Sequence, residues 1–244
     1  MGEVIAVLSG KGGTGKTSVC AGLATALADT GVKVLGIDCD IGLRNLDISL
    51  GLSQLGTLSF MDVLHNGNTL AQASVHPNYP NLQFLTAPMN CAAEEIDPTA
   101  FAAFLREARE NYHYILLDAP AGIDAGFRLA AQFADRILLV TGPDPASVRD
   151  ASRAGEVLEL MGKADVRLIV NRVSDKIVSA LKLTIDDVMD TAGLPLIGIV
   201  PEDPGVTLAA AFGKPLLKHT KKGASAACRR IAKRLQGLSV PISL

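Results

Sequence analysis

The sequence lacks paired cysteines and clustered histidines. Its four cysteines, Cys20, Cys39, Cys91 and Cys228, are scattered without a C-x-x-C pair, and the four histidines are equally isolated. Structural zinc sites and iron-sulfur clusters need such ligands at short, regular spacing. We therefore expect buried or inert thiols and no metal centre built from cysteine.

Long apolar runs are also missing. The longest, such as 137–140 and 197–200, fall far short of the roughly 20 residues that span a membrane, and the N-terminus has no basic region of the kind that opens a secretory signal. There is no second phosphate loop, no Pro/Gly/Ser-rich linker, no low-complexity tract and no internal repeat. The sequence predicts a cytoplasmic protein with a single domain over residues 1–244.

Acidic residues are absent after Asp203. Residues 1–203 carry 15 basic and 25 acidic residues, a balance of −10, whereas residues 204–244 carry 8 basic residues and no acidic one. The last sixth of the chain is therefore cationic, although the net charge of the whole chain is only −2.

Part of that cationic region has the pattern of an amphipathic helix, over residues 224–238. Two interpretations remain open: the helix lies on anionic lipid through its cations, or it packs its apolar face on the sheet. The apolar face would hold Cys228, Ile231, Leu235 and Leu238, and the opposite face Arg229, Arg230, Lys233 and Arg234.

Short runs of β-branched residues and leucine alternate with segments of helical spacing. This order is typical of an α/β fold with a mostly parallel, doubly wound sheet of about seven or eight strands, which binds ligands beyond the carboxyl ends of its strands. The predicted strands are 4–8, 32–37, 82–86, 114–117, 137–141, 166–171 and 196–200.

The strongest motif is GKGGTGKT at residues 10–17, which fits the phosphate-loop pattern G-x-x-x-x-G-K-[ST]. A predicted strand precedes it, and a predicted helix from Lys16 to about Asp29 follows it. Glycines let backbone N–H groups converge on phosphate, while the lysine adds charge and the threonine a hydroxyl for Mg²⁺. The predicted nucleotide-binding residues here are Gly10, Lys11, Gly12, Gly13, Thr14, Gly15, Lys16, Thr17 and Ser18.

Three aspartates follow predicted strands. Asp118 closes the run YILLD, and Asp38 and Asp40 end the strand VLGID. Carboxylates at converging strand ends can hold Mg²⁺ or orient an attacking water, which phosphoryl transfer requires. The alternative is that these aspartates only cap a helix or turn.

Lys11 is not explained by the loop alone. It lies five residues before Lys16, on the outer rim of the loop, where it cannot easily reach the same phosphates. Either it serves a nucleotide across a subunit interface, as an arginine finger does, or it is a solvated rim lysine.

The motif KGGTGKT resembles the deviant phosphate loop of the ParA/MinD ATPases, and further motifs at 37–47, 118–124, 147–150 and 201–203 resemble its MinD-type members. The resemblance implies a P-loop ATPase that binds ATP or ADP with Mg²⁺. It implies catalytic roles for Lys11, Lys16, Asp38 and Asp40, metal binding through Thr17, Asp38 and Asp118, and adenine contacts from Asn171, Arg172, Pro201, Glu202 and Asp203.

The same resemblance implies a homodimer with ATP, slow partner-stimulated hydrolysis, placement of the cell-division site, and a peripheral position on the inner face of the cell membrane. Ser152 replaces the second acidic residue of the family's partner-binding helix, which argues against MinC-like and MinE-like regulators. Members normally finish with a membrane-inserting helix, for which this sequence offers only the basic helix near 224–238. The alternative is a ParA-like ATPase that positions DNA or another cargo through its cationic end.

Overall fold

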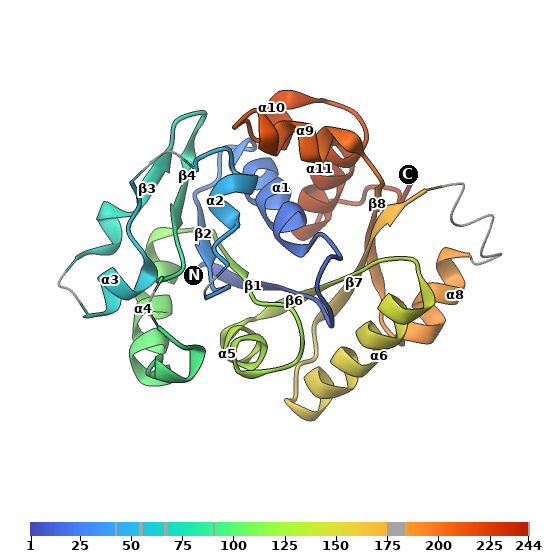
Figure 1. Ribbon diagram of the computed structural model, residues 1–244, viewed down its shortest axis with the longest axis horizontal. Helices are drawn as coiled ribbons and strands as arrows, with labels where there is room; N and C mark the ends of the chain where they lie inside the picture. The colour runs from blue at the N-terminus through green and yellow to red at the C-terminus, as the bar shows by residue number, and fades with distance from the viewer. Residues whose placement is uncertain (42, 54–55, 66–67, 90, 175–183, 244) are drawn as a thin grey trace.

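The computed structural model describes residues 1–41, 43–53, 56–65, 68–89, 91–174 and 184–243. Gly42, within one of the family-like motifs, lies outside these residues. Within the described ranges, eight strands form one sheet in the order β3-β4-β2-β5-β1-β6-β7-β8, parallel except for β3 (Figure 1). Their bounds are β1 Glu3–Leu8, β2 Val34–Asp38, β3 Ser74–His76, β4 Tyr79–Leu85, β5 Tyr114–Asp118, β6 Arg136–Thr141, β7 Val166–Val173 and β8 Leu196–Pro201.

The seven predicted strands are all present, and the prediction of a mostly parallel α/β sheet is confirmed. The edge strand β3, which pairs antiparallel with β4, was not predicted from the sequence. It is only three residues long, and its central Val75 is 54% exposed. So short and exposed a strand has no continuous apolar run by which a buried strand is recognised.

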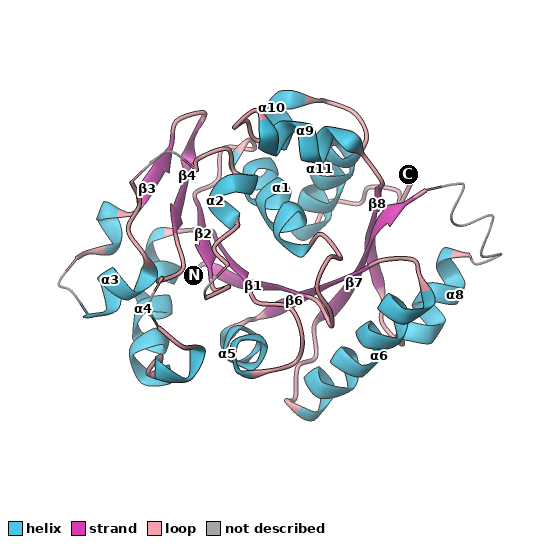
Figure 2. Ribbon diagram, viewed as in Figure 1, coloured by secondary structure: helices cyan, strands magenta, loops and turns pink. Residues whose placement is uncertain are grey.

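Helices cover both faces of the sheet (Figure 2). The central strands alternate their side chains between the faces: Ile5 and Val7 pack with α1 and α11, whereas Val4, Ala6 and Leu8 pack with α4, α5 and α6. The helices are α1 Lys16–Ala28, α2 Leu46–Ser49, α3 Phe60–His65, η1 Leu70–Gln72, η2 Ala93–Glu95, α4 Pro98–Asn111, α5 Ala125–Phe133, α6 Pro145–Leu160, α8 Ile185–Ala192, α9 Pro204–Ala211, α10 Leu216–His219 and α11 Ala224–Leu235.

The C-terminal helix α11 is docked, as the second interpretation had it. It lies beside α1 above the sheet (Figure 1), and Cys228, Ile231 and Leu235 are buried in the core that it shares with α1. The prediction for Leu238 was wrong. The helix ends at Leu235, Gly237 turns the chain with φ 82°, and Leu238 is 55% exposed.

The predicted free cationic face of α11 was also largely wrong, because its arginines bind groups of the same chain. Arg229 pairs with the Asp29 carboxylate, and Arg230 donates to the carbonyl of Ser243. Arg234 donates to the Ile197 carbonyl of β8 at 2.8 Å and to the carbonyls of Val240 and Pro241. Arg230 and Arg234 therefore hold the terminal segment against the fold, and Arg229 joins α11 to the end of α1.

Within the described ranges, no helix combines the length and apolarity needed to cross a membrane.

Candidate nucleotide-binding site

The phosphate loop connects the end of β1 to the start of α1. Gly13 and Gly15 both have φ of 83°, a left-handed backbone that favours glycine, and Gly15 is the N-cap of α1. A Cβ on Gly15 would lie 2.3 Å from Nδ2 of Asn171, so this position also needs glycine for space. The loop is thus a tight curl that brings backbone groups to the N-terminus of a buried helix.

Hydrogen bonds fix the carbonyl groups of this curl from outside. Ser9 Oγ donates to the Lys11 carbonyl at 3.0 Å, Arg172 donates to that of Gly13 at 2.8 Å, and Asn171 Nδ2 donates to that of Thr14 at 2.7 Å. In the described part of the chain, the amides of residues 12–18 donate no hydrogen bond. These free donors at a helix N-terminus suit a polyphosphate.

Lys16 lies in the floor of the site. Its Nζ is 2.7 Å from Oδ1 of Asp118 and 3.3 Å from Oγ1 of Thr17, and its side chain is only 6% exposed. Burial opposes the lysine charge, but the adjacent Asp118 carboxylate outweighs it and raises the pKa of Lys16. The cation therefore stays charged in a buried position.

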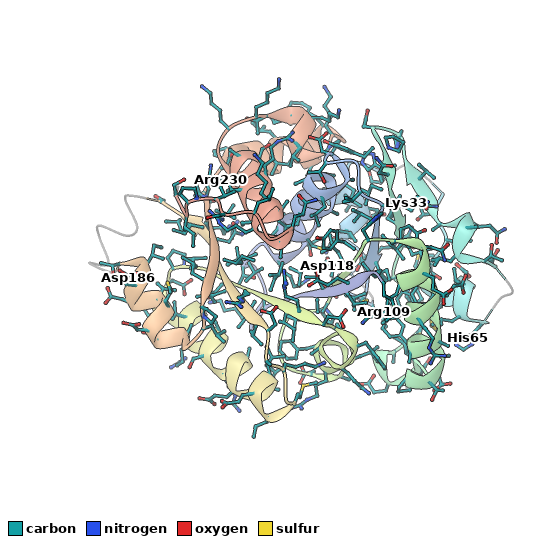
Figure 3. All side chains as sticks on the ribbon, turned by 180° about the vertical axis from the view of Figure 1, so that it is seen from behind. Lys33, His65, Arg109, Asp118, Asp186 and Arg230 are labelled. Carbon is teal, nitrogen blue, oxygen red and sulfur yellow. The ribbon has the colours of Figure 1, made fainter. Side chains whose placement is uncertain are left out.

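Asp118 is fully buried at the end of β5 (labelled in Figure 3). Burial raises its pKa, although Lys16 acts in the opposite direction. Its second oxygen, Oδ2, has no hydrogen-bond partner among the described residues. A buried acceptor oxygen without a partner fits the hydration shell of a bound Mg²⁺.

The other two predicted carboxylates lie next to it. Asp38 is the register partner of Asp118 on the neighbouring strand. Its oxygens accept hydrogen bonds from the amides of Asp40, at 2.9 Å, and of Leu46, at 3.0 Å. Burial, and after it the neighbouring Asp118, raise the pKa of Asp38 to about 7. Asp38 therefore holds the start of α2, which is the capping role that sequence analysis kept as an alternative.

Asp40 is half-buried and lines the hollow beside the phosphate loop, together with Asn45 and Ala121. Burial raises its pKa, while Lys16 lowers it. Asp40 is the predicted carboxylate with access to that hollow, since Asp38 and Asp118 are fully buried.

Lys11 is not an unpartnered rim lysine. Its Nζ lies 3.6 Å from Oδ1 of Asp144, and the two side chains are 38% and 49% exposed. Asp144 is the N-cap of α6 and accepts from the amide and hydroxyl of Ser147. This contact could not be predicted from the sequence, because Asp144 has the pattern of an ordinary helix cap before a proline.

A second hollow lies between the phosphate loop, the end of β8 and the C-terminal helices. It brings together the predicted adenine residues Asn171, Arg172, Pro201, Glu202 and Asp203 with Gly15 and Ser18 of the loop. The apolar wall of this hollow was not predicted from the sequence. It comes from α1, α9, α10 and α11 and includes Val19, Val206, Leu216 and Cys228. Nothing local marks those residues, since they meet only through the tertiary fold.

Asp203 acts mainly as a helix cap in this wall. One carboxylate oxygen accepts from the amide of Gly205 at 2.8 Å, and the other accepts from that of Ala224 at 2.9 Å. It thereby joins the starts of α9 and α11 to the end of β8. Its carboxylate shapes the hollow and has both oxygens engaged within the chain.

The residues fit a nucleotide with Mg²⁺. The free amides and Lys16 suit the phosphates, Thr17 and the buried acceptor of Asp118 suit the hydrated ion, and the half-apolar hollow suits a base.

Comparison with known proteins agrees with this geometry. The family model described as the CobQ/CobB/MinD/ParA nucleotide binding domain matches residues 5–216. The septum site-determining protein MinD of Synechocystis is 38% identical, over 99% of this chain and 92% of its own.

Two solved structures are similar over nearly their whole length. The MinC:MinD cell division protein complex of Aquifex aeolicus superimposes with a TM-score of 0.91 at 38% identity, over 99% of this chain and 98% of that one. MinD of Pyrococcus horikoshii complexed with Mg-ADP gives 0.83 at 29% identity, over 96% of each chain. This chain belongs to the MinD/ParA family of nucleotide-binding ATPases, within its group of septum site-determining MinD proteins.

Proposed function

We propose that the chain is an ATP-dependent switch of the MinD type, which hydrolyses ATP with Mg²⁺ and takes part in placing the cell-division site. The observation that carries the proposal is the phosphate loop. Its amides are free to bind phosphate, Lys16 is fixed beneath it, and Lys11 is held at its rim by one weak contact.

Each residue has a defined task in this scheme. The loop amides and Lys16 bind the phosphates, and Thr17 and Asp118 would hold the Mg²⁺ shell. Asp38, whose two oxygens accept from the amides of Asp40 and Leu46, would contact that shell only by releasing one of these bonds. The ion, when bound, neutralises charge on the phosphates. Asp40 orients the attacking water, because it is the half-buried carboxylate beside the loop. Asn171, Arg172, Pro201, Glu202 and Asp203 enclose the adenine.

Lys11 makes hydrolysis depend on a second copy of the chain. Its side chain is more than a third exposed, and a surface ion pair at 3.6 Å contributes only about 0–1 kcal/mol. Breaking the ion pair with Asp144, so that Lys11 can reach the nucleotide of a partner subunit, therefore costs little free energy. The result is a homodimer with ATP and a monomer with ADP, with slow hydrolysis until a regulator stimulates it.

A groove between α5 and α6 supports regulator binding. Its lining includes three arginines and one glutamate, together with Ser152 and the exposed Leu160: Arg128, Arg149, Arg153 and Glu156. Within the described residues these three arginines have no ion-pair partner, so the groove suits an acidic segment of a MinC-like or MinE-like protein. Ser152, which from the sequence alone argued against such regulators, removes one negative charge from this surface relative to the family pattern, so it does not oppose the binding of an acidic segment.

We place the protein in the cytoplasm, with at most weak contact with anionic lipid on the inner face of the membrane. Most cations of α11 bind within the chain, whereas Lys233 is exposed and has no ion pair among the described residues. Two subunits would present two such surfaces, so attachment should require ATP and be lost at moderate salt. The same engagement of arginines gives no support to DNA binding through α11.

The test is to separate the two lysines. Lys16→Ala should lose nucleotide binding, whereas Lys11→Ala should bind ATP within a few-fold of the unaltered protein and lose ATP-dependent dimerisation and turnover. Titration calorimetry, light scattering and phosphate release measure the three properties. Equal turnover in Lys11→Ala and the unaltered chain would contradict the proposal.

A cellular test addresses the division role. Excess unaltered protein should displace or block septa in a bacterium that uses the MinD system, and excess Lys16→Ala should not. Normal septum placement with both proteins at equal abundance would contradict the division role and leave the ATPase activity untouched.

A further inference from the structure

A bulge at the end of β7 places two successive side chains on the phosphate loop. Val170 pairs with Ile199 of β8, and Val173 pairs with Pro201, so Asn171 and Arg172 together oppose the single residue Val200. Such a bulge leaves one residue extra and redirects side chains locally. On a regular strand, Asn171 and Arg172 would point to opposite faces of the sheet.

The backbone of Arg172 adopts a strained conformation in this bulge. Its φ is 60°, a left-handed conformation that is uncommon for a residue with a side chain. Such conformations persist where surrounding structure enforces them, and they are concentrated at functional sites. Here both side chains reach the same loop, and they donate to the consecutive carbonyls of Gly13 and Thr14.

Holding those two carbonyls orients the amides on the other side of each peptide plane. In a trans peptide, the C=O group and the following N–H point in opposite directions. Fixing the carbonyl of Gly13 therefore aims the amide of Thr14 into the curl, and fixing that of Thr14 aims the amide of Gly15. Both amides are among those without an acceptor in the described chain.

We propose that Asn171 and Arg172, which we call the β7 clamp, are positioning residues for the phosphate-binding amides, in addition to lining the base hollow. Asn171 is 6% exposed, and its bond lies inside the protein, so it should contribute more than Arg172, whose side chain is 56% exposed. Glu202 lies 3.5 Å from Arg172 and steadies it from the wall of the base hollow. The clamp thus links the two hollows of the proposed ATP site.

This inference rests on the proposed function, and a ligand without a base tests it separately. Inorganic tripolyphosphate with Mg²⁺ presents the phosphates alone, so recognition of adenine cannot affect its affinity. Calorimetry would compare ATP with tripolyphosphate on the unaltered chain, Asn171→Ala and Arg172→Gly. Glycine removes the Arg172 side chain and accepts the left-handed backbone without strain.

We expect Asn171→Ala to weaken both ligands roughly tenfold and Arg172→Gly to weaken both roughly threefold, the effects of losing one buried and one exposed hydrogen bond. Arg167→Ala, at the other end of β7, is the matched control and should change neither affinity, since Arg167 is exposed and pairs with Asp165. Weaker ATP with unchanged tripolyphosphate would overturn the clamp in favour of base recognition alone. Unchanged affinity for both ligands would overturn it as well.

A second measurement needs no ligand. Backbone ¹⁵N order parameters of residues 13–16 should be lower in nucleotide-free Arg172→Gly than in the unaltered protein, while those of the neighbouring strand β1 stay the same. Equal order parameters in the loop would contradict the clamp. If the unaltered chain bound neither ATP nor tripolyphosphate, the proposed function itself would fail, whatever the variants do.

Discussion

The two lysines of the phosphate loop lie in opposite surroundings. Lys16 is buried 2.7 Å from a fully buried carboxylate of Asp118, whereas Lys11 is exposed at the rim, 3.6 Å from the half-exposed Asp144. Removing one partner of a buried pair strands a charge and costs several kcal/mol, but a surface pair contributes about 1 kcal/mol at most. One lysine is therefore fixed before any ligand arrives, and the other is free to be recruited.

Of the variants that test this difference between the two lysines, Lys16→Ala should have the largest effect. It removes the buried cation that faces the free loop amides, and we expect ATP affinity to fall roughly 100-fold or more, which calorimetry would measure. The stability of the ligand-free protein should fall less than for an ordinary buried pair, because the raised pKa of Asp118 lets the abandoned carboxyl take up a proton. Retention of ATP affinity within a few-fold would contradict the role of Lys16.

The buried carboxylates should make the ligand-free protein less stable as pH rises. The pKa of Asp38 is about 7 in the folded protein, against 3.8 as its ordinary value, so the folded state holds a proton that the unfolded state has released. That contribution is present below about pH 4 and disappears as the pH rises through about 7. Its upper bound is on the order of 4 kcal/mol.

Asp38→Asn isolates this contribution. Asparagine keeps the shape but cannot ionise, and it loses one of the two accepted hydrogen bonds, which costs about 1 kcal/mol. Thermal melts from pH 5 to pH 8 should therefore show a flatter decline in the variant than in the unaltered protein. Parallel curves would show that Asp38 is already ionised throughout this range.

Asp144→Asn should have the smallest effect on stability. It removes the charge that holds Lys11 and keeps an oxygen able to cap α6, so the free energy of unfolding should change by less than about 1 kcal/mol. Releasing Lys11 should nevertheless lower the ATP concentration at which the protein dimerises. Chemical denaturation and light scattering measure the two properties, and a large loss of stability would mean that the ion pair is structural.

The buried part of the site could be predicted from the sequence, and the contacts around its rim could not. The sequence predicted that the phosphate loop, Lys16 and Asp118 meet at one edge of the sheet, and the structure brings them together there, because a loop motif has fixed spacing and parallel strands bring their carboxyl ends together. The seven long strands could also be predicted, since each contains a short run rich in β-branched residues or leucine. Only their ends differ, with β2 beginning at Val34 and β4 at Tyr79.

The missed features depend on residues that are far apart in the chain. Asn171 meets Thr14 across 157 positions, and the bulge that aims it leaves no mark in the sequence of β7. Arg234 reads as a surface cation by helical spacing, yet it reaches the carbonyl of Ile197 on β8. Spacing within a helix says which side a residue occupies, but it cannot say which partner lies opposite.

The most direct test of the account is whether the protein still dimerises with ATP when Lys11 is replaced, which its mass in solution shows. Light scattering would compare the hydrolysis-deficient variant Asp40→Ala with the double variant Lys11→Ala, Asp40→Ala, each with saturating ATP and Mg²⁺ and, as a control, with ADP. The account predicts twice the monomer mass of 25.5 kDa for Asp40→Ala with ATP, and the monomer mass for the double variant and for both proteins with ADP. A double variant that dimerises with ATP as readily as Asp40→Ala would contradict the recruitment of Lys11.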